Sequence, residues 1–231
     1  MRRDNFELRE EQISAKVKHP FSVLYLSDFH FNAHSLTAAH WMLEQIDTLK
    51  PDIILLGGDY VDTRRGLNIF EFFLSNIPHP DNCFAVAGNH DYFFGINTLK
   101  KLLTNYGVTW IEKSFAFLNL KTIRIRIDGN LSQSAIDNDF SILCAHKPQV
   151  LNGELSNYQL ALAGHLHGSQ VVLWQNEKGL FPGRFFYKWN ILTKKISGCT
   201  CYISKGLGDT LPVRFNCKKD AIFVKVRPTP I

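Results

Sequence analysis

Residues 53–59 read Ile-Ile-Leu-Leu-Gly-Gly-Asp, so a short apolar run ends in a glycine pair and a carboxylate. Four other segments repeat this arrangement of an apolar run followed at once by polar side chains. They are residues 23–26 before Asp28 and His30, 84–87 before Gly88, Asn89, His90 and Asp91, 142–145 before His146, and 160–163 before Gly164, His165 and His167. Apolar runs of this length are consistent with buried strands. Because ligands bind beyond the carboxyl ends of strands in open α/β sheets, the pattern predicts five strands that converge on one polar site.

Helical segments separate the first three of these strands. Residues 36–49 place Trp41, Met42 and Ile46 at helical spacing, and Lys50-Pro51 ends the segment. Residues 67–76 and 96–106 have a similar pattern. The first hundred residues therefore have the order β-α-β-α-β-α, which predicts a parallel sheet with right-handed crossovers.

The second half of the chain consists mostly of strand-like segments. In residues 123–127 isoleucine alternates with arginine, which predicts one buried and one solvated face. Strands are expected at residues 6–18, 108–111, 115–120, 122–127, 170–174, 200–204 and 221–226. No linker or internal repeat divides the chain, so we expect a single domain over residues 1–231. The predicted fold is α/β, a four-layer α/β/β/α sandwich with two mixed sheets.

The composition suggests a soluble or peripheral protein. The net charge is +5 and the pI is near 8.9, but the basic residues are scattered, so no nucleic-acid partner is expected. This bias fits either a solvated surface or a preference for phosphates and acidic lipids. The five cysteines form no C-x-x-C pair, which indicates a reducing compartment. Neither a signal peptide nor a membrane-spanning apolar stretch is visible, so we expect a cytoplasmic protein, either free or peripheral on the inner membrane.

Seven side chains at the strand ends are suited to bind metal ions. Asp28 and His30 are one residue apart, as are His165 and His167, and residues i and i+2 of extended backbone project to the same side. The full set is Asp28, His30, Asp59, Asn89, His146, His165 and His167. Seven ligands exceed the four of a structural zinc site and fit two ions, either Mn, Fe, Zn or Co, that share the Asp59 carboxylate. The alternative is that these side chains only cap strand ends.

Five motifs resemble the signature blocks of the calcineurin-like metallophosphoesterases. They are Asp28-Phe-His30, Gly58-Asp59-Tyr-Val-Asp62, Gly88-Asn89-His90-Asp91, Ala145-His146 and Gly164-His165-Leu-His167-Gly168. Their order and approximate spacing match that family, and they span residues 28–168. The resemblance implies the sandwich fold of the family and hydrolysis of a phosphoester.

The resemblance also implies a role for each of these residues. One metal would be held by Asp28, His30, Asp59 and His167, and the other by Asp59, Asn89, His146 and His165. A hydroxide that bridges the two ions would attack phosphorus. His90 would contact the phosphate or protonate the leaving oxygen, and Asp91 would orient its imidazole. As alternatives, His90 is structural, Asp91 caps the following helix, and Asp62 is either a supporting residue or an ordinary loop acid.

The end of the chain resembles one bacterial branch of this family, which includes chlamydial-type UDP-2,3-diacylglucosamine pyrophosphatases. The resemblance lies in residues 205–216 and in Gln170-Val171 after the last histidine motif. It implies hydrolysis of a lipid-linked pyrophosphate to UMP and a lipid sugar phosphate, manganese as the ion most active in vitro, and residues 206–214 at the rim of the site. The alternative is that residues 206–214 form an ordinary turn before the last strand. Ser169 stands where that branch often has a second glycine, and a membrane anchor common in the branch is not visible.

Other functions stay open from the sequence. The chain could hydrolyse a soluble nucleotide or a phosphoprotein, or act as a non-catalytic scaffold on the same fold. Residues 179–192 interleave aromatic residues with Arg184 and Lys188, which fits either a lipid interface or packing on the second sheet. The expected partners are a small-molecule or lipid-linked phosphate substrate and, at most, a peripheral membrane contact.

Overall fold

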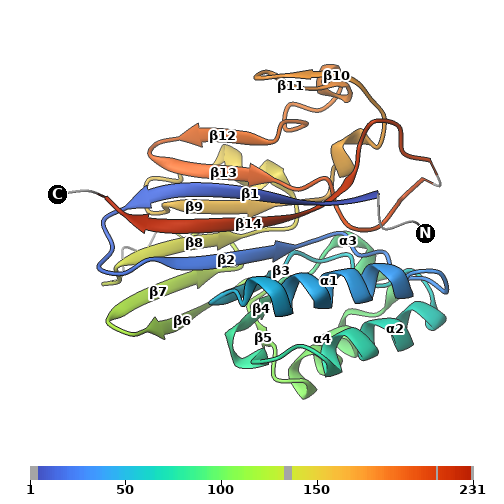
Figure 1. Cartoon of the computed structure of the whole chain (residues 1–231), viewed down its shortest axis with the longest axis horizontal. Coiled ribbons are helices and arrows are strands. Elements are labelled where there is room, and N and C mark those ends of the chain that lie inside the picture. The colour runs from blue at the N-terminus through green and yellow to red at the C-terminus, as the bar shows by residue number, and fades with distance from the viewer. Residues whose placement is uncertain (1–4, 133–136, 212, 230–231) are drawn as a thin grey trace.

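The computed structural model describes residues 5–132, 137–211 and 213–229. Two six-stranded mixed sheets pack face to face, and the four α-helices of the described residues cover the outer face of the first sheet (Figure 1). The expected sandwich of two mixed sheets is therefore confirmed. Among the described residues, no helix has the length and apolar character needed to cross a membrane.

The first sheet contains the parallel strands predicted for the first hundred residues. Its strands, in spatial order, are β1 (Phe6–Ala15), β14 (Lys219–Pro228), β2 (Phe21–Leu26), β3 (Ile53–Leu56), β4 (Cys83–Ala85) and β5 (Thr109–Trp110). Strands β2 to β5 are parallel, and β14 is antiparallel to β2 and parallel to β1. The strand expected at residues 6–18 is thus observed as β1, and it lies at the edge of this sheet.

Three helices bury apolar stripes against this sheet: α1 (Leu36–Leu49), α2 (Arg64–Ser75) and α4 (Ile96–Asn105). The short α3 (Asn89–Phe94) buries only Asp91. Met42 of α1, Phe70 of α2 and Leu99 of α4 are fully buried in one core. Helix α1 has the predicted bounds, whereas α2 begins before residue 67 because Thr63 Oγ1 accepts a hydrogen bond from the Gly66 N–H. The short helix α3 was not predicted.

The second sheet completes the apolar interior. Its strands, in spatial order, are β12 (Thr193–Ile196), β13 (Cys199–Ile203), β9 (Leu160–Ala163), β8 (Phe140–Cys144), β7 (Ile123–Asp128) and β6 (Phe115–Leu120). Strand β12 was not predicted. Arg124 of β7 is exposed as expected, but the expectation is wrong for Arg126. That side chain is buried because its Nε and Nη2 donate to Asp128 Oδ1, at 3.0 and 2.9 Å.

The fourth layer of the sandwich, which covers the outer face of the second sheet, contains no α-helix among the described residues. Within the described part of the chain, a 3-10 turn (Pro148–Asn152) and neighbouring loops cover the outer face of the second sheet, burying Leu151, Tyr158 and Trp189. Strands β10 (Val172–Asn176) and β11 (Gly179–Pro182) form a separate antiparallel hairpin at the top of Figure 1.

Candidate metal centre

The carboxyl ends of five strands meet where the two sheets face each other. Strands β2, β3 and β4 come from the first sheet, and β8 and β9 from the second. Three groups of side chains beyond these ends have ligand atoms within 4.8 Å of one another: Asp28, His30 and His167; Asp59, His146 and His165; and His30, Asp62 and His90. The structure therefore brings the sequence-selected residues together.

The first group joins the two sheets. Asp28 and His30 follow β2, whereas His167 follows β9, and all three are almost completely buried. His167 Nε2 lies 3.7 Å from Asp28 Oδ1. The backbone N–H of His165 donates to both Asp28 carboxylate oxygens, at 2.9 and 3.0 Å, which fixes the orientation of that carboxylate.

The second group lies beside it. His146 Nε2 is 3.3 Å from Asp59 Oδ2, 3.2 Å from His165 Nδ1 and 3.1 Å from Asn89 Oδ1. On the other edge of the ring, His146 Nδ1 is 2.9 Å from the carbonyl oxygen of Gly57. A proton on Nδ1 would bind this carbonyl and leave the Nε2 lone pair directed at Asp59, His165 and Asn89, as in many metal-binding histidines.

Asp59 lies between the two groups. Its Oδ2 is 3.6 Å from His30 Nε2 in the first group and 3.3 Å from His146 Nε2 in the second. His30 Nε2 is buried, and the described residues give it no hydrogen-bond partner, while His30 Nδ1 lies 2.8 Å from Asp62 Oδ1. Because a buried polar atom without a partner is costly, this nitrogen fits a ligand atom for a cation. These side chains therefore fit the role of ligands for two cations, one on either side of Asp59, better than the role of capping strand ends.

Left-handed backbone positions these side chains. Asp28, His30, Asp59, His165 and His167 have φ of 55°, 44°, 55°, 75° and 50°. Residues other than glycine rarely adopt these values, and such strain is typical of functional sites. Extended backbone was therefore the wrong reason to expect convergence, and His165 and His167 belong to different groups, as the family resemblance implied. Hydrogen bonds from Asp28 N to Gly58 O (3.0 Å) and from His30 N to Asp59 O (2.9 Å) hold the loops in place.

The buried charges influence one another. Burial lowers the pKa of His167 to about 4, which favours a neutral ring. Burial acts the same way on His146, but Asp59 and Asp28 raise its pKa to about 9 overall. In turn, His146 and His30 hold the pKa of Asp59 below its usual range despite burial. In the metal-free protein a proton on His146 thus balances the carboxylates, and a bound cation would replace that proton.

His90 lies at the mouth of the centre, with 42% of its side chain exposed. Its ring packs edge-on against His30, with 4.8 Å between the centroids. Its Nδ1 is 3.8 Å from Asp62 Oδ1, the same oxygen that lies 2.8 Å from His30 Nδ1. Asp62 therefore faces both imidazoles, which favours the supporting role over the ordinary loop acid.

The expectation that Asp91 orients His90 is wrong. Asp91 is fully buried, and both of its carboxylate oxygens accept backbone hydrogen bonds. Oδ2 accepts from Gly88 N (2.7 Å) and Asp59 N (2.9 Å), and Oδ1 accepts from Tyr60 N (2.8 Å). Asp91 lies in the first turn of α3 and caps the start of that helix, whereas the alternative interpretation had it cap the helix that follows, and it also fixes the loop that carries Asp59.

At two positions that precede ligand residues, Gly88 and Gly164, the neighbouring atoms leave no room for a side chain. A Cβ on Gly88 would collide with the carboxylate of Asp59, and a Cβ on Gly164 would collide with Ser27 Oγ and Asp28 Oδ2. Only a residue without a side chain lets these backbone segments approach the carboxylates.

Leu207, Gly208 and Arg214 of the segment expected at the rim lie against the first group. The N–H of Leu207 donates to the carbonyl oxygen of Ser27 at 3.0 Å. Arg214 Nη2 is 3.3 Å from His167 Nδ1 and donates to Gly208 O at 2.7 Å. The expected rim position is thus observed, but the contact between Arg214 and His167 was missed. The only signal for it was a basic residue within that segment.

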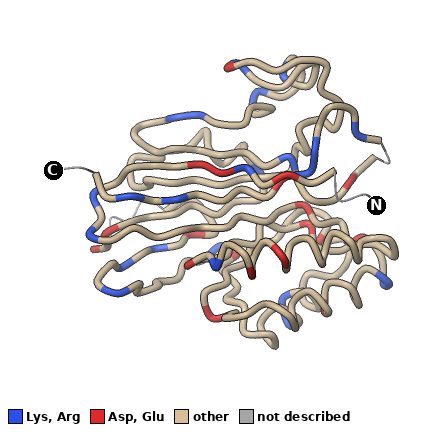
Figure 2. Tube along the Cα trace, in the orientation of Figure 1, with Lys and Arg blue, Asp and Glu red and all other residues tan. Residues whose placement is uncertain are grey.

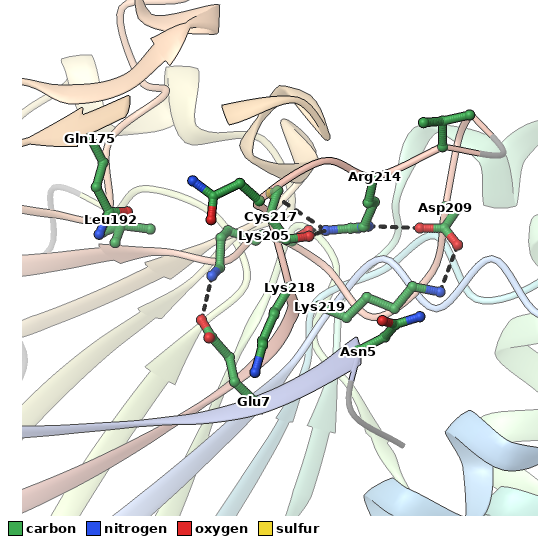
Figure 3. Close-up of a pocket in the computed structure, with 12 residues that line it drawn as sticks. Asn5, Glu7, Gln175, Leu192, Lys205, Asp209, Arg214, Cys217, Lys218 and Lys219 are labelled. Atoms are coloured by element: carbon green, nitrogen blue, oxygen red, sulfur yellow. Dashed lines mark hydrogen bonds and ion pairs between the residues drawn. The ribbon is translucent and has the colours of Figure 1, made fainter. Parts of the chain in front are cut away.

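Two cavities near the centre differ in character. The larger, about 830 Å³, is lined by Lys205, Arg214, Lys218 and Lys219 together with acidic side chains but by none of the metal-ligand residues, and Arg214 links it to His167. In Figure 3, Asp209 lies between two of these cations, with Oδ1 2.7 Å from Arg214 Nε and Oδ2 2.6 Å from Lys219 Nζ. The smaller, about 450 Å³, is lined by Asn89, His146, Tyr92, Phe93 and Val150 among others. One cavity is therefore basic, and the other has apolar side chains.

Comparisons with known proteins give a consistent result. The family model for calcineurin-like phosphoesterases matches residues 21–209. An uncharacterised metallophosphoesterase of Helicobacter pylori is 25% identical over 92% of this chain, and the chain spans only 61% of that relative's length. Phosphodiesterase YaeI of Escherichia coli is 25% identical over 90% of this chain and 82% of its own. The UDP-2,3-diacylglucosamine pyrophosphatase LpxG of Chlamydia trachomatis is 36% identical over 32% of this chain and 23% of its own.

Proposed function

Because the chain belongs to the family of calcineurin-like phosphoesterases, we propose that it hydrolyses phosphoesters at a two-metal centre. The ligands would form two sets that share Asp59: Asp28, His30 and His167 on one side, and Asn89, His146 and His165 on the other. The observation that carries the proposal is the position of Asp59 Oδ2, which lies 3.6 Å from His30 Nε2 and 3.3 Å from His146 Nε2. Two divalent ions bound there would lower the pKa of a water nucleophile and neutralise charge on the phosphoryl oxygens.

The side chains around the centre would act on the leaving group. His90 lies at the mouth, where its exposed ring can reach a bound ester, and we propose that it donates a proton to the leaving oxygen. Asp62 would hold the His90 ring and stabilise its protonated form. Asp91 would act only on structure, by fixing the backbone of Asp59.

The cavity lined by Asn89, His146, Tyr92 and Phe93 supports a substrate that carries an apolar substituent on the phosphorus, because it opens beside two of the ligand residues. A phosphodiester or pyrophosphate would place one half there. The basic cavity lies behind Arg214, on the Nδ1 side of His167, and none of the ligand residues lines it. Together with the partial similarity to the chlamydial enzyme, the cavity with Tyr92 and Phe93 supports UDP-2,3-diacylglucosamine as a candidate substrate, with UMP and the lipid sugar phosphate as products.

The first experiment tests the centre with a generic diester. The purified protein is given Mn²⁺, and hydrolysis of bis(p-nitrophenyl) phosphate is compared with that of p-nitrophenyl phosphate while the metal content is measured. We expect faster hydrolysis of the diester, and loss of both activity and bound metal in Asp59→Asn. His19→Ala is a matched control, because His19 is an exposed loop residue before the amino end of β2, away from the carboxyl ends. A wild type that binds two ions without hydrolysing either ester would favour the scaffold interpretation.

The second experiment tests the substrate. The protein is incubated with UDP-2,3-diacylglucosamine, and UMP release is followed in the wild type, Asp59→Asn and His90→Ala. Release that both variants abolish would support the lipid substrate. Diester hydrolysis without UMP release would reject this substrate and leave the metal centre in place.

A further inference from the structure

Exposed apolar side chains are unevenly distributed over the described residues. Nine of the thirteen large ones lie between Val171 and Phe215. The most prominent form an aromatic patch on the β10–β11 hairpin and the turn after it, consisting of Leu173 (58% exposed), Trp174 (47%), Phe185 (69%), Phe186 (78%) and Tyr187 (52%). Folded proteins rarely leave such a group in water unless another surface covers it.

Packing beneath the patch holds its side chains outward. Trp174 stacks on the ring of Phe181, with centroids 5.1 Å apart and planes within 2°, and Phe185 packs against Phe181 at 5.0 Å. Phe181 itself is buried, so it forms the base on which the exposed rings rest. The patch is thus a fixed feature of the fold.

The patch is continuous with the segment that touches the metal centre. Val171 pairs with Phe215 in a parallel bridge. The Gln170 side chain donates to the carbonyl oxygen of Leu211 (2.8 Å) and accepts from its N–H (2.8 Å). Leu211 and Phe215 are also exposed, at 61% and 57%. These contacts fix the patch relative to Arg214 and the basic cavity.

The charges around the patch are predominantly positive. From Gln170 to Ile196 the chain has five basic residues, Lys178, Arg184, Lys188, Lys194 and Lys195, and one acidic residue, Glu177. Lys and Arg lie on the hairpin and along the neighbouring strand β12 in Figure 2. In a two-fold contact between copies of this chain, the same positive surface would face itself, which disfavours a second copy as the partner. Aromatic rings surrounded by Lys and Arg instead suit the interface of an anionic bilayer.

We propose that the aromatic patch docks on the surface of an anionic lipid bilayer. The rings of Trp174, Phe185 and Phe186 enter the headgroup region, while the surrounding cations contact the lipid phosphates. Docking brings the rim of the metal centre close to the bilayer, because Gln170, Leu211 and Phe215 link the two. The proposal does not depend on the proposed hydrolytic activity, since the patch lies outside the metal-binding groups.

Vesicle binding tests the proposal. The wild type is centrifuged with vesicles of phosphatidylcholine mixed with phosphatidylglycerol, and with vesicles of phosphatidylcholine alone. We expect binding to the anionic vesicles that weakens as salt increases. Phe185→Ser/Phe186→Ser should weaken it by on the order of tenfold or more, because two large apolar side chains no longer leave water. Phe115→Ser is the matched control, because Phe115 is 48% exposed on β6, outside both the patch and the metal centre, and its loss should leave binding unchanged.

Further measurements test the contribution of the cations, the insertion of Trp174 and the independence of docking from catalysis. Lys194→Glu/Lys195→Glu should lose the preference for anionic vesicles. In the wild type, lipids brominated on their acyl chains should quench the fluorescence of Trp174, and Trp174→Phe should remove that quenching. If the double serine variant does not fold, this quenching measurement shows whether the patch enters the bilayer. Asp59→Asn should bind vesicles as the wild type does, which distinguishes docking from catalysis.

Two results would overturn the proposal. One is equal binding of the wild type and the double serine variant to anionic vesicles. The other is no vesicle binding at all, together with a concentration-dependent dimer that the double serine variant abolishes, which would assign the patch to a second copy of the chain.

Discussion

Substitution of Asp91 by Asn distinguishes structural support from a direct role in chemistry. Asp91 is buried, and its two oxygens accept three backbone hydrogen bonds, at 2.7, 2.8 and 2.9 Å. Asparagine has only one acceptor oxygen. Its least costly orientation keeps that oxygen at Gly88 N and Asp59 N and turns the NH₂ group toward the N–H of Tyr60, where two donors then face each other.

The expected magnitude follows from these contacts. A hydrogen bond to a charged group contributes about 1.5–3 kcal/mol, and the variant loses one such bond and weakens two others by removing the charge. We therefore expect the free energy of unfolding to fall by about 3 kcal/mol. For a domain of this size, 1 kcal/mol shifts the melting temperature by about 2–4 °C, so Tm should fall by about 6–12 °C.

Urea unfolding followed by circular dichroism measures this change. Both proteins are treated with a chelator, so that metal binding does not add to the difference. Asp62→Asn is the control, because Asp62 is 32% exposed and its loss should change stability by less than about 1 kcal/mol. Wild-type stability in Asp91→Asn, combined with loss of phosphoester hydrolysis, would refute the reasoning and restore the role in orienting His90.

Four further predictions concern the centre and its surroundings. Chelation should abolish hydrolysis and Mn²⁺ should restore it, as measured with the generic diester. Asp62→Asn should slow hydrolysis of alkyl diesters by about 10²-fold but affect nitrophenyl diesters less, because a good leaving group needs no proton from His90. Ser169→Gly should raise Tm, because Ser169 has φ of 61° and a buried Oγ without a partner among the described residues. Burial alone would raise the pKa of Asp209, but Lys219 and Arg214 lower it overall, so its stabilisation is present above about pH 4 and is lost as the pH falls through its lowered pKa. Asp209→Asn should thus be about 2 kcal/mol less stable than the wild type at pH 7, and urea titrations should show that the difference disappears in acid.

The sequence alone determined the five strands that lead to the metal centre and the site they share. The apolar runs before Asp28, Asp59 and His146 mark buried strands, because a strand between packed layers needs apolar side chains on both faces. The bounds of α1 followed from helical spacing and from the Lys50-Pro51 stop. These signals are local, so they can be detected without knowing how the sheets pack.

Only the tertiary structure decided which side chain faces which. It placed Asp62 rather than Asp91 beside His90 and put Arg214 against His167, whereas the family resemblance had already assigned His165 and His167 to different metals. Each result depends on left-handed turns at the strand ends and on contacts between segments far apart in the chain. Periodicity in the sequence reports which face of an element is apolar, whereas these contacts are determined by how the two sheets pack against each other.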